Sequence, residues 1–204
     1  DLAAATNFVL ALKGLAPVQL TEIHPLIGHG SKAMIEAGLK AHGCSVEEAE
    51  LSHLHARFLE FYAANVAVSS RPFEYIPDLI DLLKGQGATL AVCTNKVEHL
   101  SKLLLESLGL DQHFACIAGR DTFAACKPSP VHLLGTIASA GGDPKRAVMV
   151  GDSEVDIATA KAASVPSVAV TFGYTPRHVR EFDPDVIIDH YREFMPALDR
   201  VLGA

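Results

Sequence analysis

VMVGDSEVD, at residues 148–156, is the stretch of this sequence that decides its fold. Residues 147–150 form a near-continuous apolar run, as expected for a parallel strand that is buried on both faces. The run ends at Gly151, and the carboxylates of Asp152 and Asp156 follow four residues apart. Ligand sites of open α/β sheets lie just past the carboxyl ends of such strands. The stretch therefore predicts a buried strand that leads into a ligand site.

The two acids of this turn have two interpretations. Mg²⁺ takes one or two carboxylates and leaves positions for the phosphate oxygens of a substrate, so Asp152 and Asp156 can form a magnesium site. Alternatively, Ser153 caps a helix and Asp156, three residues on, completes a capping box. Taken alone, the stretch favours the capping box. Polar residues elsewhere in the chain are needed to favour the magnesium site.

Composition excludes several classes of function. Hydrophobic residues make up 49% and charged residues 20% of the 204 residues, as in globular proteins. A formal net charge of −7 argues against general nucleic-acid binding, and no apolar run reaches the ~18 residues of a membrane span. The four cysteines contain no C-x-x-C pair, which suits a reducing compartment. We therefore expect a cytoplasmic protein without nucleic-acid or membrane partners.

The pattern of apolar residues divides the chain near Ser69–Pro72. Before this point it predicts helices at 2–12, 31–39 and 47–65, and no strand. After this point, strand-like runs and helical patterns alternate, which predicts βαβ units and a parallel sheet covered on both faces. The expected strands are 88–93, 114–118, 147–150, 167–172 and 186–188, and the expected helices are 77–85, 97–108, 130–140 and 154–163.

Polar residues follow the first three expected strands. Thr94 and Asn95 are good helix N-caps, but the Thr94 hydroxyl and nearby backbone N–H groups can also hold phosphate oxygens at a helix N-terminus. Lys127, which precedes a proline, is either a solvated lysine or a fixed positive charge against a transferring phosphoryl group. A hydroxyl, a lysine and an acidic pair thus occur in order at successive strand ends. Their joint occurrence favours a phosphoryl-transfer site.

These residues match the motifs of a known family. The chain resembles a phosphatase of the haloacid dehalogenase (HAD) superfamily, in its phosphoglycolate phosphatase-like branch. Thr94-Asn95 resembles the second motif, Lys127-Pro128 the third, and GDSxxD at 151–156 the fourth. The resemblance implies an α/β fold in which a HAD-like Rossmannoid parallel sheet core, residues 71–204, carries an α-helical cap domain, residues 1–70.

The resemblance also implies a reaction, which is hydrolysis of a phosphate monoester through an aspartyl-phosphate intermediate. By this likeness Asp152 binds Mg²⁺ directly and Asp156 binds it directly or through water. Thr94 and Asn95 hold phosphoryl oxygens, and Lys127 neutralises charge on the nucleophile and the phosphoryl group. The expected partner is a small phosphorylated metabolite, 2-phosphoglycolate, bound by a monomer or a homodimer. Alternatives are pyrophosphate, a sugar phosphate, or a non-catalytic relative that binds only a phosphate ligand or a protein partner.

The chain departs from the family pattern at its N-terminal end. The first motif, Asp-x-Asp, carries the nucleophile and the general acid/base, and its place would be just before residue 1; Asp1 does not match it. We therefore expect the nucleophile upstream of this chain. We also expect a gap in the sheet between the strands ending at Cys93 and Val150, where the first core strand is missing. Roughly 10–20 further residues would supply that strand and the catalytic loop.

Two further positions depart from the family pattern, because Tyr75 and Ser164 stand where glycine is usual. If the Ser164 position is left-handed, serine in place of glycine costs on the order of 1 kcal/mol there, which a folded protein tolerates.

The helical region contains one glycine-rich turn, IGHGSK at residues 27–32. One interpretation is a turn in which Ser31 is the N-cap of the next helix. The other is a loop that covers the site, where His29, Gly30, Ser31 and Lys32 bind the distal anionic group of the substrate through side chains or helix N–H groups.

Overall fold

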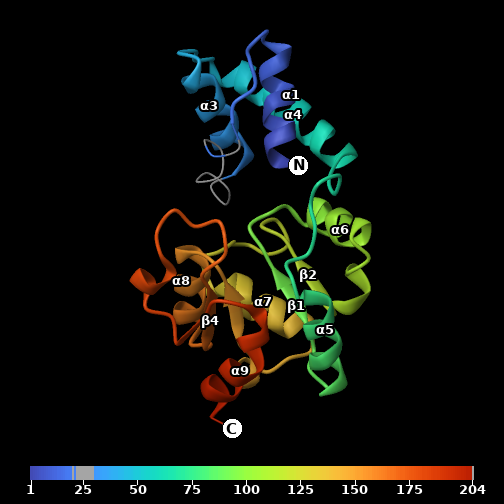
Figure 1. Cartoon of the computed structure of the whole chain (residues 1–204), viewed down its shortest axis with the longest axis vertical. Helices are drawn as coiled ribbons and strands as arrows, with labels where there is room; N and C mark the ends of the chain where they lie inside the picture. Colours follow the sequence, from blue (N-terminus) through green and yellow to red (C-terminus); the bar gives the residue numbers. More distant parts are fainter. Residues whose placement is uncertain (20, 22–29, 204) are drawn as a thin grey trace. The chain divides into compact units, whose positions relative to one another are not determined.

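The computed structural model describes residues 1–19, 21 and 30–203. It divides into two compact units, Asp1–Arg71 and Pro72–Ala204. The first unit is helical, and the second contains all the described strands (Figure 1). The change from helices to alternating strands and helices therefore falls at the proline that follows Ser69–Ser70–Arg71.

Three helices of the first unit pack against one another: α1 (Leu2–Leu12), α3 (Ser31–Ala41) and α4 (Glu48–Ala64). Each lies within two residues of the expected range. Their shared interior buries Leu10, Ile35 and Phe58 almost completely. A Cβ atom on Gly38 would lie 3.0 Å from the Leu10 side chain, so this glycine lets α1 and α3 approach closely.

Asp1 is bound within this helical unit. Its carboxylate accepts hydrogen bonds from the N–H groups of Ser69, at 2.9 Å, and Ser70, at 2.8 Å. The Ser70 hydroxyl donates to the same carboxylate at 2.6 Å. Asp1 thus ties the start of α1 to the end of the unit.

The second unit alternates strands and helices in the expected order. Its strands are β1 (Ala91–Cys93), β2 (Cys116–Ala118), β3 (Met149–Gly151), β4 (Ser167–Val170) and β5 (Val186–Ile188). Its α-helices are α5 (Ile76–Gly85), α6 (Glu98–Ser107), α7 (Pro130–Ser139), α8 (Glu154–Ala163) and α9 (Phe194–Leu202). Short 3₁₀ turns lie at Asp111–His113, Pro144–Arg146, Val179–Phe182 and Tyr191–Glu193.

The strands form two parallel sheets. β1 pairs with β2, and β3, β4 and β5 pair in that order. Within the described part of the chain, β1 and β3 have no pairing with each other. Val150, inside β3, is 36% exposed, and Ala91, inside β1, is also exposed. Both strands thus combine an unpaired edge with exposed apolar residues, although their sequences are typical of buried strands.

Helices cover both faces of the β3–β4–β5 sheet. Val168 and Val170 pack with residues of α5 and α9, whereas Ala169 packs with Ile157 of α8 on the opposite face. This alternation follows from the two-residue period of a strand. Helix α7 contacts β1 and β2 and also packs against α8, which contacts β3 and β4. The α7–α8 pair therefore links the two sheets.

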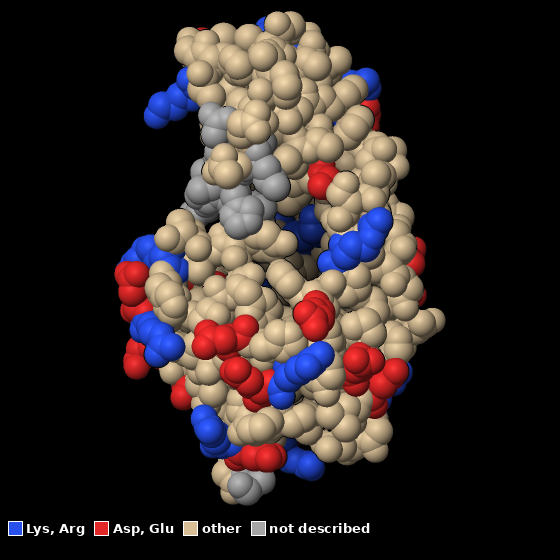
Figure 2. All heavy atoms as spheres, viewed as in Figure 1, with Lys and Arg blue, Asp and Glu red and all other residues tan. Residues whose placement is uncertain are grey.

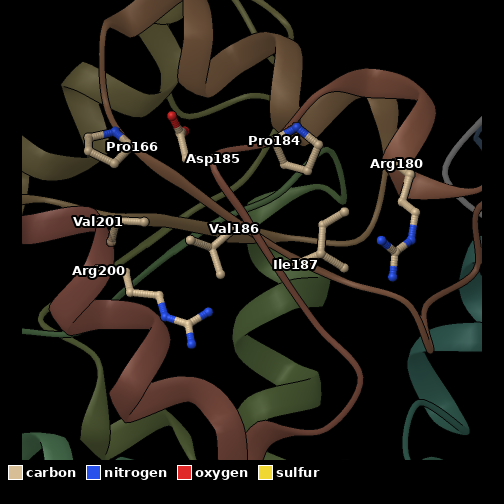
Figure 3. Close-up of a pocket in the computed structure, with 8 residues that line it drawn as sticks. All are labelled: Pro166, Arg180, Pro184, Asp185, Val186, Ile187, Arg200 and Val201. Carbon is tan, nitrogen blue, oxygen red and sulfur yellow. The ribbon is translucent and has the colours of Figure 1, made fainter.

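A surface cavity of about 650 Å³ lies beside the outer strand β5 (Figure 3). Arg180 and Arg200 stand at opposite ends of it, with Val186 and Ile187 between them. None of the residues that line this cavity is a candidate site residue from the sequence.

On the face drawn in Figure 2, basic and acidic side chains are interspersed over the α/β unit. No described helix is long and apolar enough to cross a membrane.

Two expected helix caps are wrong. Helix α6 begins at Glu98 with Val97 as its N-cap, so Thr94 and Asn95 lie in the turn before it; Asp121 accepts the Glu98 N–H instead, at 2.8 Å. Helix α3 begins at Ser31 itself, with Gly30 as N-cap at a φ of 99°. A φ of this kind suits glycine.

Candidate active site

The residues singled out from the second unit lie together at the carboxyl ends of β1, β2 and β3. Thr94 follows β1 and donates its backbone N–H to the carbonyl oxygen of Ala118, the last residue of β2, at 3.0 Å. The Thr94 hydroxyl oxygen accepts the Lys96 N–H at 3.1 Å, and its own proton is left for another acceptor. Parallel strands end at one edge of their sheet, which is why residues far apart in sequence meet here.

Lys127 and Asp156 form a buried ion pair. The Lys127 Nζ atom lies 2.5 Å from Oδ1 of Asp156, and the side chains are 11% and 8% exposed. Removal of either partner would leave a buried charge without its counterion. Lys127 is therefore a fixed cation of the site and not a solvated lysine of a turn.

Asp156 also completes the capping box expected from the sequence. Its Oδ2 accepts the Ser153 hydroxyl at 2.7 Å and the N–H groups of Ser153 and Asp152 at 3.2 Å each. The Ser153 hydroxyl in turn accepts the Asp156 N–H at 3.4 Å. A Cβ atom on Gly151 would lie 2.3 Å from the Asp156 side chain, so the strand must end in glycine here. Both oxygens of Asp156 are thus engaged by groups of the protein.

The carboxylate of Asp152, unlike that of Asp156, is only partly engaged by the protein. One carboxylate oxygen, Oδ2, accepts the Tyr174 N–H at 2.7 Å, and Oδ1 has no hydrogen bond to any residue that the structure describes. A Cβ atom on Gly173 would lie 2.1 Å from the Asp152 side chain, so glycine permits this close approach of the loop after β4. The negative charge of Asp152 acts on Tyr191. Burial, and then this charge, raise the pKa of Tyr191 to about 12.

These donors fit a Mg²⁺ ion of the kind that keeps several water ligands. Among the residues described, no three His, Cys, Asp or Glu side chains gather into a metal cage. Mg²⁺ does not need such a cage, since one or two carboxylates and the oxygens of a phosphate suffice. Asp152 offers a free carboxylate oxygen for direct ligation. Asp156, whose oxygens are engaged, fits a water-mediated role better than a direct one.

The side chain of Asn95 binds the backbone of Lys127. Its Oδ1 accepts the Lys127 N–H, and its Nδ2 donates to the Lys127 carbonyl oxygen, both at 3.0 Å. The Lys127 N–H also points at Nδ1 of His132, at 3.1 Å. His132 was not a candidate from the sequence, because nothing in the local pattern distinguishes it from a core residue of α7. These contacts engage both polar atoms of the Asn95 side chain.

Lys96 adds a second basic side chain near the end of β1. Burial lowers the pKa of this lysine to about 8, so it is partly neutral near physiological pH. Burial also raises the pKa of the Cys93 thiol, although the positive charge of Lys127 opposes that shift. The thiol is thus held in its neutral form, as a small hydrophobic group.

The residues singled out from the first unit make contacts within that unit. Lys32 forms an exposed ion pair with Glu48 at 2.6 Å. The Ser31 hydroxyl lies 2.7 Å from Nε2 of His55. Gly30 caps α3 without a side-chain hydrogen bond. His29 lies outside the described residues.

Comparison with known proteins agrees with this geometry. The model of the haloacid dehalogenase-like hydrolase family matches residues 2–170. The phosphoglycolate phosphatase of Agrobacterium fabrum is 46% identical over 97% of this chain and 85% of its own length. The N-acetylmuramic acid 6-phosphate phosphatase of Pseudomonas aeruginosa is 32% identical over 99% of this chain and 89% of its own. The crystal structure of a predicted phosphoglycolate phosphatase from Haemophilus somnus superposes with a TM-score of 0.89 at 27% identity, covering 97% of this chain and 90% of that one.

Proposed function

Because the chain belongs to the haloacid dehalogenase-like hydrolase family and is a phosphatase, we propose that it hydrolyses 2-phosphoglycolate with Mg²⁺ as cofactor. The observation that carries this proposal is the arrangement of Thr94, Lys127 and Asp152 after the carboxyl ends of β1, β2 and β3, where Lys127 is held in a buried ion pair with Asp156. The high identity to a relative named for this activity supports the choice of substrate.

Each residue of the site has a distinct task in the proposed reaction. Asp152 holds the metal through its free oxygen, and Asp156 orients Lys127 and the turn that carries Asp152. Thr94 donates its hydroxyl proton, and Asn95 its backbone N–H, to phosphoryl oxygens. Lys127 stabilises negative charge on the phosphoryl group and on the attacking carboxylate. When bound, Mg²⁺ supplies further charge stabilisation at the phosphoryl oxygens.

The nucleophile is proposed to be an aspartate on a strand upstream of Asp1. The unpaired edges of β1 and β3, together with the exposed Val150 and Ala91, support a place for one more strand between them. A strand inserted there would satisfy backbone N–H and C=O groups on both edges, which proteins rarely leave buried and unpaired. Its carboxyl end would bring a carboxylate to the edge that already holds Thr94, Lys127 and Asp152.

Specificity is proposed to come from the helical unit, as the cap domain. The second anionic group of the substrate would be bound by residues 29–32, through Lys32 and the N–H groups at the start of α3. The N-cap of α3 supports this role, because it is Gly30, which has no side chain to bind the first N–H groups, and no other described residue caps them. The Lys32–Glu48 pair is exposed and therefore weak, so a substrate anion can compete for the lysine.

A sugar phosphate is the second candidate substrate, favoured by the similarity to the N-acetylmuramic acid 6-phosphate phosphatase. The deciding experiment compares kcat/KM of the full-length protein for 2-phosphoglycolate, N-acetylmuramic acid 6-phosphate and pyrophosphate in the presence of Mg²⁺. The proposal expects the highest value for 2-phosphoglycolate. A higher kcat/KM for the sugar phosphate or for pyrophosphate would make that compound the substrate in place of 2-phosphoglycolate. Hydrolysis of none of the three compounds removes all three as substrates, and the proposed reaction on 2-phosphoglycolate with them.

Cellular location and assembly follow as part of the same proposal. The four cysteines are all unpaired in the structure, and this supports a reducing cytoplasm as the working environment. A monomer or a homodimer is expected, and sedimentation equilibrium distinguishes the two.

A further inference from the structure

We propose that His132 is a positioning residue of the phosphatase, which holds the Lys127 backbone in place by accepting its N–H at Nδ1. This role rests on the proposed function, because it concerns how the lysine of that site is fixed. Among the residues described, the ring makes its one hydrogen bond of normal geometry with the Lys127 backbone, so we place its effect on that lysine.

The first observation is the location of His132. Its side chain is completely buried in α7, five residues after Lys127. Burial of a histidine costs free energy of desolvation, which leucine or isoleucine at the same place would not cost. Its ring lies edge-on to Phe123, with the ring centroids 6.0 Å apart and an interplanar angle of 68°. The ring is therefore held in one orientation by packing.

The second observation is the hydrogen bonding of the ring. Nδ1 accepts the Lys127 N–H at 3.1 Å, so in the neutral ring the proton resides on Nε2. Nε2 is buried, with no hydrogen bond of normal geometry to any described residue. The backbone at Ala118 and Gly119 is close enough to the ring to act on the pKa of His132 as a hydrogen-bonding group. The contact of normal geometry is therefore the one at Nδ1.

The third observation is the protonation state. Burial, and then the positive charge of Lys127, lower the pKa of His132, while the backbone at Ala118 and Gly119 opposes the shift. A neutral ring is what the contact requires, since a protonated ring has no acceptor at Nδ1. The location of the histidine and its environment thus favour the same state.

The fourth observation is the path from this contact to the ion pair. The Lys127 N–H is shared between His132 on α7 and Asn95 after β1, and the Lys127 Nζ atom reaches Asp156 on α8. Three elements therefore converge on one lysine. A displacement of about 1 Å in a catalytic group can cost about a hundredfold in rate. Loss of one of two backbone acceptors is expected to cost about tenfold.

The test compares two substitutions of His132 in the full-length protein. His132→Leu removes the acceptor but keeps an apolar side chain of similar size. His132→Asn places Oδ1 near the position of Nδ1 and restores the acceptor. We expect kcat for 2-phosphoglycolate to fall about tenfold in H132L, with a smaller change in KM, and to recover in H132N. Thr136→Val, which alters a buried neighbour in α7 that donates to the His132 carbonyl, is the control expected to keep its kcat.

Three results overturn the role of His132. They are an unchanged kcat in a folded H132L, an equal loss in H132L and H132N, or a loss in T136V as large as that in H132L. A measurement without catalysis separates this inference from the proposed function: a coupling across the hydrogen bond between the ¹⁵N nuclei of the Lys127 amide and His132 Nδ1. The coupling is expected in the wild-type protein whether or not it hydrolyses 2-phosphoglycolate. Its absence in a well-resolved spectrum also overturns the role.

Discussion

The Nζ atom of Lys127 lies 2.5 Å from Oδ1 of Asp156, and this pair joins the loop after β2 to the first turn of α8. Because Asp156 also accepts the Asp152 and Ser153 N–H groups, the lysine is coupled to the turn that carries the proposed metal ligand. One ion pair thus holds two parts of the site that are far apart in sequence.

The first prediction concerns the stability of this pair. Lys127→Met leaves the Asp156 carboxylate buried without its counterion, so the free energy of unfolding should fall by about 3–5 kcal/mol. Lys161→Met is the matched control, since Lys161 and Asp183 form an exposed pair with side chains 48% and 97% exposed. That substitution should cost less than about 1 kcal/mol. Urea unfolding of both variants measures the two losses. Equal losses of unfolding free energy would mean that the buried pair stabilises the protein no more than the exposed pair does.

The second prediction concerns Asp152. Asp152→Asn removes the carboxylate whose Oδ1 is free for Mg²⁺, so hydrolysis by the full-length protein should fall by about a hundredfold or more at ordinary Mg²⁺ concentrations. Glu154→Gln changes an exposed acid in the same turn, whose partner is Arg177 at 3.5 Å, and should leave the rate nearly unchanged. Activity retained in D152N would remove Asp152 from the metal site.

Left-handed backbone at Ser164 gives the third prediction. Ser164 ends α8 at a φ of 54°, as expected from the glycine usual at this position. Ser164→Gly should stabilise the protein by up to about 1 kcal/mol, which corresponds to a Tm increase of about 2–4 °C for a chain of this size. Ser139→Gly, inside the last turn of α7, should instead lower the Tm, because glycine costs entropy in a helix. A lower Tm for S164G would contradict the strain argument.

The fourth prediction concerns pH and Lys96. Its pKa is 10.5 in the unfolded chain and about 8 in the folded protein, so between these values the unfolded chain binds more protons. Stability therefore rises with pH in this range, and the full cost of burying the charge is present only below pH 8. Lys96→Met should stabilise the protein at neutral pH, by at most on the order of 3 kcal/mol, and the gain should shrink toward pH 10.5.

Lys145→Met, at an exposed lysine of the 3₁₀ turn Pro144–Arg146, is the control for that experiment, and its effect should lack this pH trend. Chemical unfolding at neutral pH and at pH 10.5 measures both differences. A gain for K96M that is independent of pH would show that the packing of the methionine, and not the lysine charge, is responsible.

The fifth prediction concerns substrate binding by the helical unit. Lys32→Ala should lower kcat/KM for 2-phosphoglycolate more than for a neutral aryl phosphate, because only the first substrate carries a second anionic group. Lys40→Ala, in the last turn of the same helix, should affect neither substrate. Equal effects of K32A on both substrates would exclude Lys32 from recognition.

The sequence predicted the positions of the helices and strands better than the contacts between them. Apolar periodicity located α1, α4 and α8 within two residues, and it located β5 at its observed bounds. The capping box at Ser153 was also predicted, because both of its members lie in one short stretch. Thr94 and Asn95 were wrong as helix caps, since the chain makes a further turn, bound to β2 through Thr94, before α6 begins.

Contacts between distant segments could not be predicted from periodicity. The hydrogen bonds of Asn95 to Lys127 span 32 residues, and the pairing of Lys127 with Asp156 spans 29. His132 gave no signal because a histidine in an apolar helix looks like a core residue until its neighbours are known. Helix α9 was not expected, although it covers β4 and β5.

The most direct test of the account measures phosphate release from 2-phosphoglycolate with Mg²⁺, for residues 1–204 alone and for the full-length protein. Among the residues that the structure describes, β1 and β3 each have an unpaired edge, and this supports a further strand whose aspartate is the nucleophile. The account therefore predicts turnover by the full-length protein, loss of that turnover in K127A and D152N, and none by residues 1–204. Robust turnover by residues 1–204 would contradict it, because another carboxylate would then have to be the nucleophile.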